Sequence, residues 1–241
     1  MTPFDPNLPP HSDPRYCAQC GERAWAFCAG LDEDSVTALR RVVARQVADA
    51  GQTLYREGDP AGDLYTVTAG CVKLYKLLAD GRRQVTAFLY PGDVFGLVRD
   101  GRQTATAEAV TAANLCRFSR TGLDALFRDQ PAVRERLFGL LLSELGEAQE
   151  QMLLLGRKTA REKLATFLLG QVRRAESLCG QDGPLVLPMG RADIADHLGL
   201  TIETVSRTLT ALQREGLVSL GRAGRVTVLD DAPLHEAASG G

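Results

Sequence analysis

The stretch RADIADHLGLTIETVSRTLTALQREGLV, residues 191–218, restricts the fold of this chain more than any other. Its apolar residues recur at helical spacing on both sides of Gly199, and Thr201 stands where it can cap the second of two helices. The run LVSLGRAGRVTVL that follows has the pattern of a β-hairpin. Two short helices at a glycine turn, followed by a hairpin, predict a winged helix-turn-helix. The residues expected to pack inward are Ala192, Ile194, Ala195, Leu198, Val205, Leu209 and Leu212.

The outward face of the second helix carries side chains that can read DNA. Glu203, Ser206 and Arg207 share one face because they lie at positions i, i+3 and i+4. In the major groove Arg can donate to guanine O6 and N7, Glu can accept from cytosine N4, and Ser can pair with several bases. The same face could instead be solvated, with a Glu203–Arg207 ion pair. Together with the preceding helix, the turn and the hairpin, the pattern favours DNA binding.

Four further positions are predicted to touch DNA around this face. Thr201 and Thr204 begin the second helix, Arg191 begins the first, and Arg222 lies in the hairpin. The two arginines suit phosphate oxygens rather than base edges. Residues 151–229 carry 11 Lys and Arg against 7 Asp and Glu, a net charge of +4, although the whole chain has −2. This basic part favours a polyanionic partner, here double-stranded DNA.

Residues 52–116 have a different sequence pattern, in which short β-forming runs alternate with turn signals. Glycines recur at short intervals, and ADGR at 79–82 fits a hairpin turn. Many short strands with regular turns predict a small antiparallel barrel or roll. We expect a short helix before it, at residues 32–44, and a helical region after it, at 122–176.

Apolar residues in this helical region step by 4, 3, 4, 3 and 4 along one narrow stripe. The spacing is that of the a and d positions of a two-stranded coiled coil. The stripe could pack on its own domain, but its polar flanks favour contact between two copies of the chain. A homodimer is therefore predicted. Its interface residues would be Leu141, Leu145, Ala148, Met152, Leu155 and Thr159.

Cysteines crowd into the segment CAQCGERAWAFC, residues 17–28. Its three thiols can reach one metal ion or cluster, and a fourth ligand must then come from elsewhere. The segment supplies Cys17, Cys20 and Cys28, and the other candidates are Cys71, Cys116 and Cys179.

Strand alternation bears on the fourth ligand. In TAGCVKLYK it places Cys71 with Lys73 on the more solvated face, whereas in NLCRFSR it places Cys116 on one face with Phe118. Three thiols could instead bind zinc together with His11. The compact cysteine run of a bacterial ferredoxin is absent from the sequence, which argues against an electron carrier.

These motifs are similar to those of the CRP/FNR superfamily of bacterial transcription regulators. EGDPAGDLYTVTAGCVKLYK resembles the β-roll signature of that family, and residues 191–218 resemble its helix-turn-helix. The Glu-x-x-Ser-Arg pattern at 203–207 resembles the FNR branch, which reads TTGAT half-sites. The resemblance implies a homodimeric activator, not an enzyme, that binds TTGAT-N4-ATCAA palindromes and works with RNA polymerase.

The resemblance also implies a cofactor. Cys116 resembles the distal ligand of oxygen-sensing FNR proteins, which hold a 4Fe–4S cluster with three N-terminal cysteines. By this likeness Cys17, Cys20, Cys28 and Cys116 would hold a cluster that controls dimerisation in response to oxygen. The C-x2-C-x7-C spacing departs from the C-x2-C-x5-C of some members and resembles that of other cluster-bearing branches. Nitric oxide, haem and structural zinc are the alternative signals or ligands.

Cyclic-nucleotide binding is not expected, although relatives with this roll bind cyclic AMP. Those relatives use a Gly-Glu pair and an Arg-Ser/Thr-Ala segment, whereas this chain has Asp93 for the Glu and Gln103 where the Arg should stand. Arg102 comes one residue early, and strand alternation would turn it to the opposite face.

The sequence thus predicts an α+β fold with a cyclic-nucleotide-binding-like β-roll, a long dimerisation helix and a winged helix-turn-helix. No run approaches the ~20 apolar residues of a membrane span, and the start of the chain does not resemble a secretory signal. We expect a cytoplasmic protein, whose thiols stay reduced. Its predicted segments are a cysteine-rich region at 1–30, the roll at 31–130, the dimerisation helix at 131–178 and the DNA-binding domain at 179–241.

Overall fold

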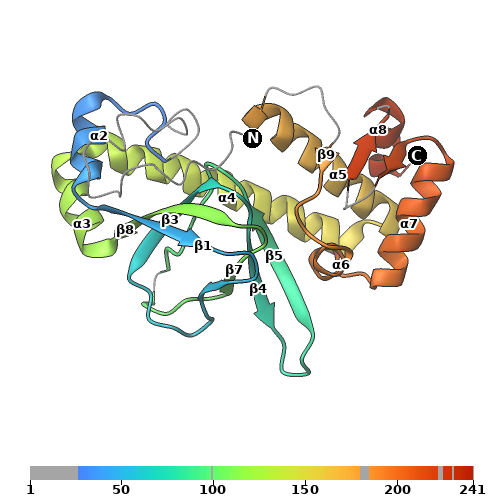
Figure 1. The fold of residues 1–241 in the computed structure, drawn as a ribbon, viewed down its shortest axis with the longest axis horizontal. Coiled ribbons are helices and arrows are strands. Elements are labelled where there is room, and N and C mark those ends of the chain that lie inside the picture. Colours follow the sequence, from blue (N-terminus) through green and yellow to red (C-terminus); the bar gives the residue numbers. More distant parts are fainter. Residues whose placement is uncertain (1–26, 99, 180–184, 222–224, 230, 241) are drawn as a thin grey trace. The chain divides into compact units, whose positions relative to one another are not determined.

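The computed structural model describes residues 27–98, 100–179, 185–221, 225–229 and 231–240. The chain divides into two compact units, and most of their helices and strands are labelled in Figure 1. The first unit comprises the described part of Met1–Lys76 together with Thr86–Leu145. The second comprises Leu77–Val85 together with the described part of Gly146–Gly241. The tip of one β-hairpin, Leu77–Val85, therefore belongs with the C-terminal unit.

The first unit is built on two four-stranded sheets, and the predicted β-roll is confirmed. The first sheet has the order β1-β8-β3-β6, with β1 at Val43–Ala48, β8 at Ala113–Ser119, β3 at Asp63–Ala69 and β6 at Val94–Phe95. The second has the order β2-β7-β4-β5, with β2 at Thr53–Tyr55, β7 at Thr106–Ala109, β4 at Val72–Leu77 and β5 at Arg83–Leu89. Both sheets contribute to one apolar core that contains Ala48, Tyr65, Val67, Val72, Leu89, Phe95, Ala107, Ala109, Ala113 and Leu115.

The tight turns of the roll depend on glycine at two positions. Gly70 has φ +83°, and a Cβ there would lie 2.2 Å from the carbonyl oxygen of Ala112. Gly96 has φ +91°, and a Cβ there would lie 2.7 Å from the carbonyl oxygen of Asp63. Only glycine adopts such a backbone and leaves this space open.

The short helix expected at 32–44 is present as α2, Glu33–Arg40, which Asp32 caps. It ends earlier than predicted, because Val43–Ala48 forms β1 and pairs with β8. The prediction that Cys71 and Lys73 lie on a solvated face is wrong, since both side chains are buried. The ammonium of Lys73 lies inside the second sheet, 3.0 Å from the carboxylate of Glu108, and this ion pair permits its burial.

The helical region at 122–176 is not continuous. It consists of α3 at Arg120–Asp129, α4 at Pro131–Arg157 and α5 at Ala160–Cys179. Pro131 separates α3 from α4, because a proline is favoured at the first position of a helix but not inside one. Thr159 separates α4 from α5: its N–H donates to the carboxylate of Glu162 at 2.5 Å, in the manner of a capping box. The stripe predicted to run along one helix to Thr159 therefore ends with α4.

The C-terminal unit contains the predicted winged helix-turn-helix. Its helices are α6, Arg191–Leu198, and α7, Ile202–Arg214, and Gly199 between them has φ +62°. Of the residues expected to pack inward, Ile194, Leu198 and Val205 are buried, but Ala192 is exposed. The hairpin pairs β10, Val218–Leu220, with β11, Arg225–Val228.

Two elements of this unit have no counterpart in the sequence-based prediction. β9, Leu185–Val186, pairs with β11 in a sheet of order β10-β11-β9. Helix α8, Asp231–Ser239, packs against α5. Among the helices of the described ranges, none is both long and apolar enough to cross a membrane.

Candidate DNA-reading face and cysteine site

The N-terminal turn of α7 presents the predicted reading face. Thr201 caps the helix, since its hydroxyl accepts the N–H of Thr204 at 3.2 Å. Glu203 and Arg207 are exposed, and Ser206 is half-buried. Hydrogen bonds from its own backbone N–H and from the Thr201 hydroxyl lower the pKa of Glu203. The carboxylate is therefore an acceptor at neutral pH, as contact with a cytosine amino group requires.

The arginines around this face have partners within the chain. Arg207 donates to the hydroxyl of Thr204 at 3.5 Å, and Arg191 of α6 donates to the hydroxyl of Ser206 at 3.1 Å. Among the ion pairs of the described residues, none joins Glu203 to Arg207. Arg191, predicted as a phosphate contact, here links the two helices of the motif. Arg222, the other predicted phosphate contact, lies outside the described residues.

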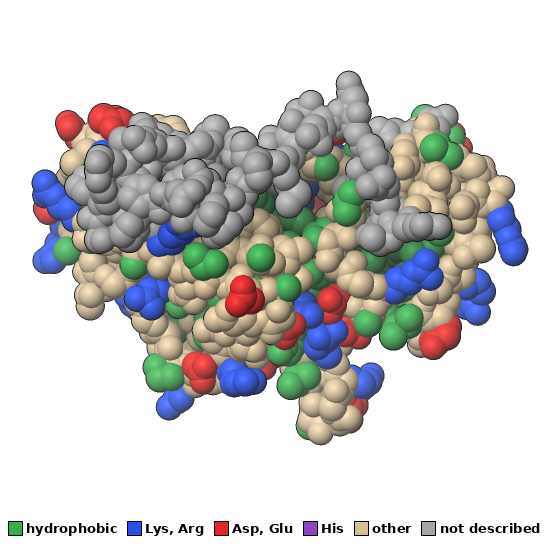
Figure 2. Space-filling view, viewed as in Figure 1, with side chains coloured by type: hydrophobic (Ala, Val, Ile, Leu, Met, Phe, Trp, Pro, Cys, Tyr) green, Lys and Arg blue, Asp and Glu red, His purple; other side chains and the backbone are tan. Residues whose placement is uncertain are grey.

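One residue of the reading face was not singled out from the sequence. Ile202 begins α7 and is 48% exposed, although it is fully apolar. It lies one helical turn before Ser206, so the helical period could have indicated it. An exposed aliphatic side chain at this place suits the methyl group of thymine. Figure 2 shows that Lys and Arg side chains also lie over α7.

The predicted cysteine ligands that are described lie at one apolar cluster of the first unit. Cys28 and Cys116 are both half-buried and both pack against this cluster. The rings of their neighbours Phe27 and Phe118 meet edge to face, with centroids 5.3 Å apart and planes at 74°. Cys17 and Cys20 lie outside the described residues. Within the described ranges, no group of three His, Cys, Asp or Glu side chains could hold a metal ion.

The same cluster includes the start of the long helix. Val133 and Leu137 of α4 are buried in it, with Leu123 and Leu126 of α3. Arg136 of α4 donates to the carbonyl of Phe27 at 3.4 Å. Phe27 and Cys28 therefore lie against α4 through apolar packing, and Phe27 also through a hydrogen bond. Two half-buried thiols on one cluster fit part of a four-thiolate site.

Aromatic rings occupy part of the interior of the roll. The rings of Tyr55, Tyr65 and Phe95 lie 5.1 to 6.1 Å apart, and burial raises the pKa of Tyr55. Gln103 is 5% exposed and donates to the carbonyl of Gly96 at 3.4 Å. Arg102 is exposed and donates to the carbonyl of Gly58 at 2.8 Å.

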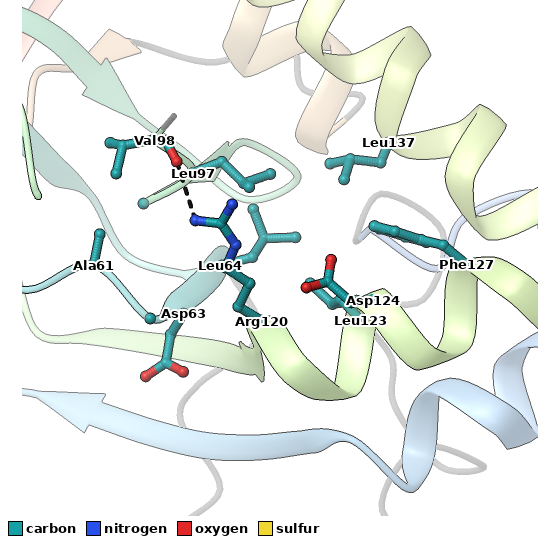
Figure 3. A pocket seen from close by; sticks show the side chains of 12 residues that line it. Ala61, Asp63, Leu64, Leu97, Val98, Arg120, Leu123, Asp124, Phe127 and Leu137 are labelled. Carbon is teal, nitrogen blue, oxygen red and sulfur yellow. Dashed lines mark hydrogen bonds between the residues drawn. The ribbon is translucent and has the colours of Figure 1, made fainter. Parts of the chain in front are cut away.

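A small cavity lies beside the roll, between the turn that follows β6 and helices α3 and α4 (Figure 3). Arg120 crosses it and donates to the carbonyl of Val98 at 3.3 Å. Its volume of about 90 Å³ is well below the ~300–1,000 Å³ of typical ligand sites. It has no room for a nucleotide.

Apolar side chains line one exposed face of α4. Of the predicted interface, Leu141, Leu145, Ala148 and Met152 are exposed and Leu155 is half-buried. Thr159 is also exposed, but it lies beyond α4. Phe138, Leu142 and Leu153 were not in the predicted stripe and are exposed as well. The face is thus wider than a strict a and d seam.

Two family models match the chain. The cyclic nucleotide-binding domain matches residues 45–130, and the Crp-like helix-turn-helix domain matches residues 162–237. These matches cover the roll and the DNA-reading unit respectively.

The chain is also similar to characterised proteins over most of its length. It is 39% identical to the nitrogen fixation regulation protein FixK of Bradyrhizobium diazoefficiens, over 93% of this chain and 94% of FixK. It is 40% identical to the transcriptional activator protein FnrL of Cereibacter sphaeroides, over 92% of this chain and 91% of FnrL. The solved structure of FixK2 from Bradyrhizobium japonicum superimposes with a TM-score of 0.76 at 39% identity, over 81% of this chain and 97% of that one.

Proposed function

The chain belongs to the CRP/FNR family and is a DNA-binding transcriptional activator of its FNR/FixK branch, and from this premise we propose that it responds to oxygen through a cysteine-bound 4Fe–4S cluster. The observation that carries the proposal is the position of Cys28 and Cys116 on one apolar cluster with the start of α4. A ligand held between them would bear on the helix that carries the exposed apolar face.

The residues that would hold the cluster are Cys17, Cys20, Cys28 and Cys116. When bound, a 4Fe–4S cluster would supply the sensitivity to oxygen. The protein's own part is to fix the Cys28 segment, through the edge contact of Phe27 with Phe118 and the hydrogen bond from Arg136. If Phe27 and Cys28 are released, Phe27 leaves the apolar cluster, and α4 loses packing at its start. A coupling free energy of ~1–3 kcal/mol between the cysteine site and DNA binding suffices to change the affinity for DNA 5–150-fold.

The exposed apolar face of α4 would pair with the same face of a second copy. Two copies related by a twofold axis present two α7 helices about one turn of DNA apart, which matches a palindrome. We assign Glu203, Ser206 and Arg207 to the bases of a TTGAT-N4-ATCAA operator. Activation then requires contact with RNA polymerase, the second macromolecular partner.

The decisive experiment is anaerobic purification followed by analysis of iron, sulfide and the visible spectrum. Wild type should carry about four irons and four sulfides per chain. Cys28→Ser and Cys116→Ser should lose them, while Cys71→Ala, whose side chain lies in the roll core, should keep them. Bound zinc with no iron would support the structural-zinc alternative. Iron that survives Cys116→Ser would refute the ligand assignment.

A further inference from the structure

Helix α6 has too little intrinsic stability to hold its own position. It has eight residues, and its N-cap is Gly190, which makes no side-chain cap hydrogen bond. A helix of this length is marginal in water without tertiary contacts. Its apolar face, with Ile194, Ala195 and Leu198, is buried. What holds the opposite face therefore matters for the whole helix-turn-helix.

The opposite face of α6 carries two carboxylates. Asp193 and Asp196 lie three residues apart and so project from the same side of the helix. At 100° per residue this side is opposite to the apolar face. Asp196 lies in the last turn, where the helix dipole disfavours a negative charge. Two carboxylates three residues apart repel each other, and a cation placed between them offsets this repulsion.

Arg83 supplies that cation from the hairpin tip. Its Nη2 lies 2.6 Å from Asp193 Oδ1, and its Nε lies 2.7 Å from Asp196 Oδ2. All three side chains are less than one third exposed. A planar guanidinium can hold two acceptors at fixed positions, which a lysine ammonium does not do as rigidly. Arg83 and α6 are about 110 residues apart in sequence, but both belong to the C-terminal unit.

The hairpin makes further contacts with the end of α6. Gln84 donates to the carbonyl of His197 at 3.2 Å, and the ring Nδ1 of His197 lies 3.1 Å from the carbonyl of Val85. The tip is closed by backbone hydrogen bonds: the N–H of Leu78 donates to the carbonyl of Arg82 at 2.8 Å, and Gly81 has φ +86°. The hairpin therefore contacts α6 through Arg83, Gln84 and Val85, and the side chain of Arg82 takes no part in these contacts.

These contacts leave the DNA-reading face open. Glu203 and Arg207 of α7 are exposed, and Arg191 of α6 bonds to Ser206 at the junction of the two helices. The hairpin thus contacts α6 through Asp193 and Asp196, and it leaves the DNA-reading face of α7 exposed. Its loss should weaken DNA binding rather than relieve inhibition.

From this arrangement we propose that Arg83 is a positioning residue for DNA binding. It fixes α6 through Asp193 and Asp196, and α6 fixes the recognition helix α7. The inference rests on the proposed operator only for its affinity readout, because the order of α6 can be measured without DNA.

The test compares Arg83→Gln with Arg82→Gln, which removes the same charge from the exposed neighbouring residue of the tip. Binding to a TTGAT-N4-ATCAA duplex is measured anaerobically over a range of salt concentrations. Arg83→Gln should weaken binding about tenfold, within the 5–150-fold range of coupled sites, and leave the salt slope unchanged. Arg82→Gln should bind like wild type. In an Asp193→Asn, Asp196→Asn background, Arg83→Gln should have no further effect.

Three results would overturn the proposal. Arg83→Gln could bind DNA as tightly as wild type or more tightly, or it could weaken binding equally in the wild-type and the Asp193→Asn, Asp196→Asn backgrounds. The third result is a salt slope for Arg83→Gln that is lower than that of wild type by ~1. The last would make Arg83 a direct phosphate contact. If the wild type does not bind this duplex, the proposed operator fails, and amide hydrogen exchange of α6 decides in its place. Arg83→Gln should then increase exchange at Ile194–Leu198 at least fivefold relative to Arg82→Gln, and equal exchange would refute the positioning role.

Discussion

Glutamate placed on the exposed apolar face of α4 should separate the dimer without unfolding the chain. Leu145 is 54% exposed and Met152 is 65% exposed in the single chain. A carboxylate at either position meets water in the monomer, so the free energy of unfolding should change by no more than ~0.5 kcal/mol. The two substitutions therefore test association and not folding.

The cost in the dimer is much larger, because a twofold axis brings each new carboxylate into the interface twice. Removing an unpaired carboxylate from water costs several kcal/mol per ion. If only ~3 kcal/mol of this appears in the association free energy, the dimer Kd rises by more than a hundredfold. A micromolar sample of Leu145→Glu or Met152→Glu should then be monomeric.

Sedimentation velocity of anaerobic protein measures this directly, and circular dichroism verifies that each variant is folded. Ser143→Glu is the matched control: it adds the same charge to an exposed position of α4, on the side away from Leu145. It should sediment like wild type. If Leu145→Glu and Met152→Glu also sediment like wild type, the two copies meet elsewhere, and the exposed face of α4 needs another explanation.

Three further predictions concern single residues. Arg207→Ala should lose ~1–3 kcal/mol of preference for the G of TTGAT in binding to duplex variants; uniform weakening of all duplexes would make it a backbone contact. Glu108→Ala should lower the unfolding free energy in urea by ~3 kcal/mol, since it removes the carboxylate 3.0 Å from the buried ammonium of Lys73; a similar loss in Glu108→Gln would show that charge rather than packing is responsible. Burial lowers the pKa of His197 below 6.5, so the unfolded chain takes up a proton at a higher pH than the folded chain does. The free energy of unfolding should therefore fall as the pH drops through 6.5, and His197→Gln should remove this dependence.

The elements that the sequence predicted well are specified by neighbouring residues. The helix-turn-helix follows from helical spacing around Gly199, and the roll follows from turn signals between short runs. Both are short-range patterns, which hold before tertiary contacts form. The helix boundaries at Pro131 and Thr159 were also encoded locally, by a proline and a capping box, although residues 122–176 were interpreted as one helical region.

The errors come from pairings between distant residues. The burial of Lys73 depends on Glu108 in another strand, and β9 is a strand because it pairs with β11. Of the candidate sites, the reading face of α7 could be predicted, since its residues lie within one helix. The support by Arg83 could not, because an arginine after a hairpin turn has no local pattern that identifies two aspartates about 110 residues away.

The carbonyl of His197, at the end of α6, is where two long-range contacts of the C-terminal unit meet. It accepts Gln84 of the hairpin at 3.2 Å and Gln151 of α4 at 3.0 Å. A carbonyl has two lone pairs, so both bonds can form at once, and each satisfies an acceptor that a helix end would otherwise leave open. A movement of α4 that withdraws Gln151 would leave the hairpin as the main support of α6. The two supports should therefore be coupled, and removal of the Arg83 contact should make DNA binding more sensitive to changes in α4.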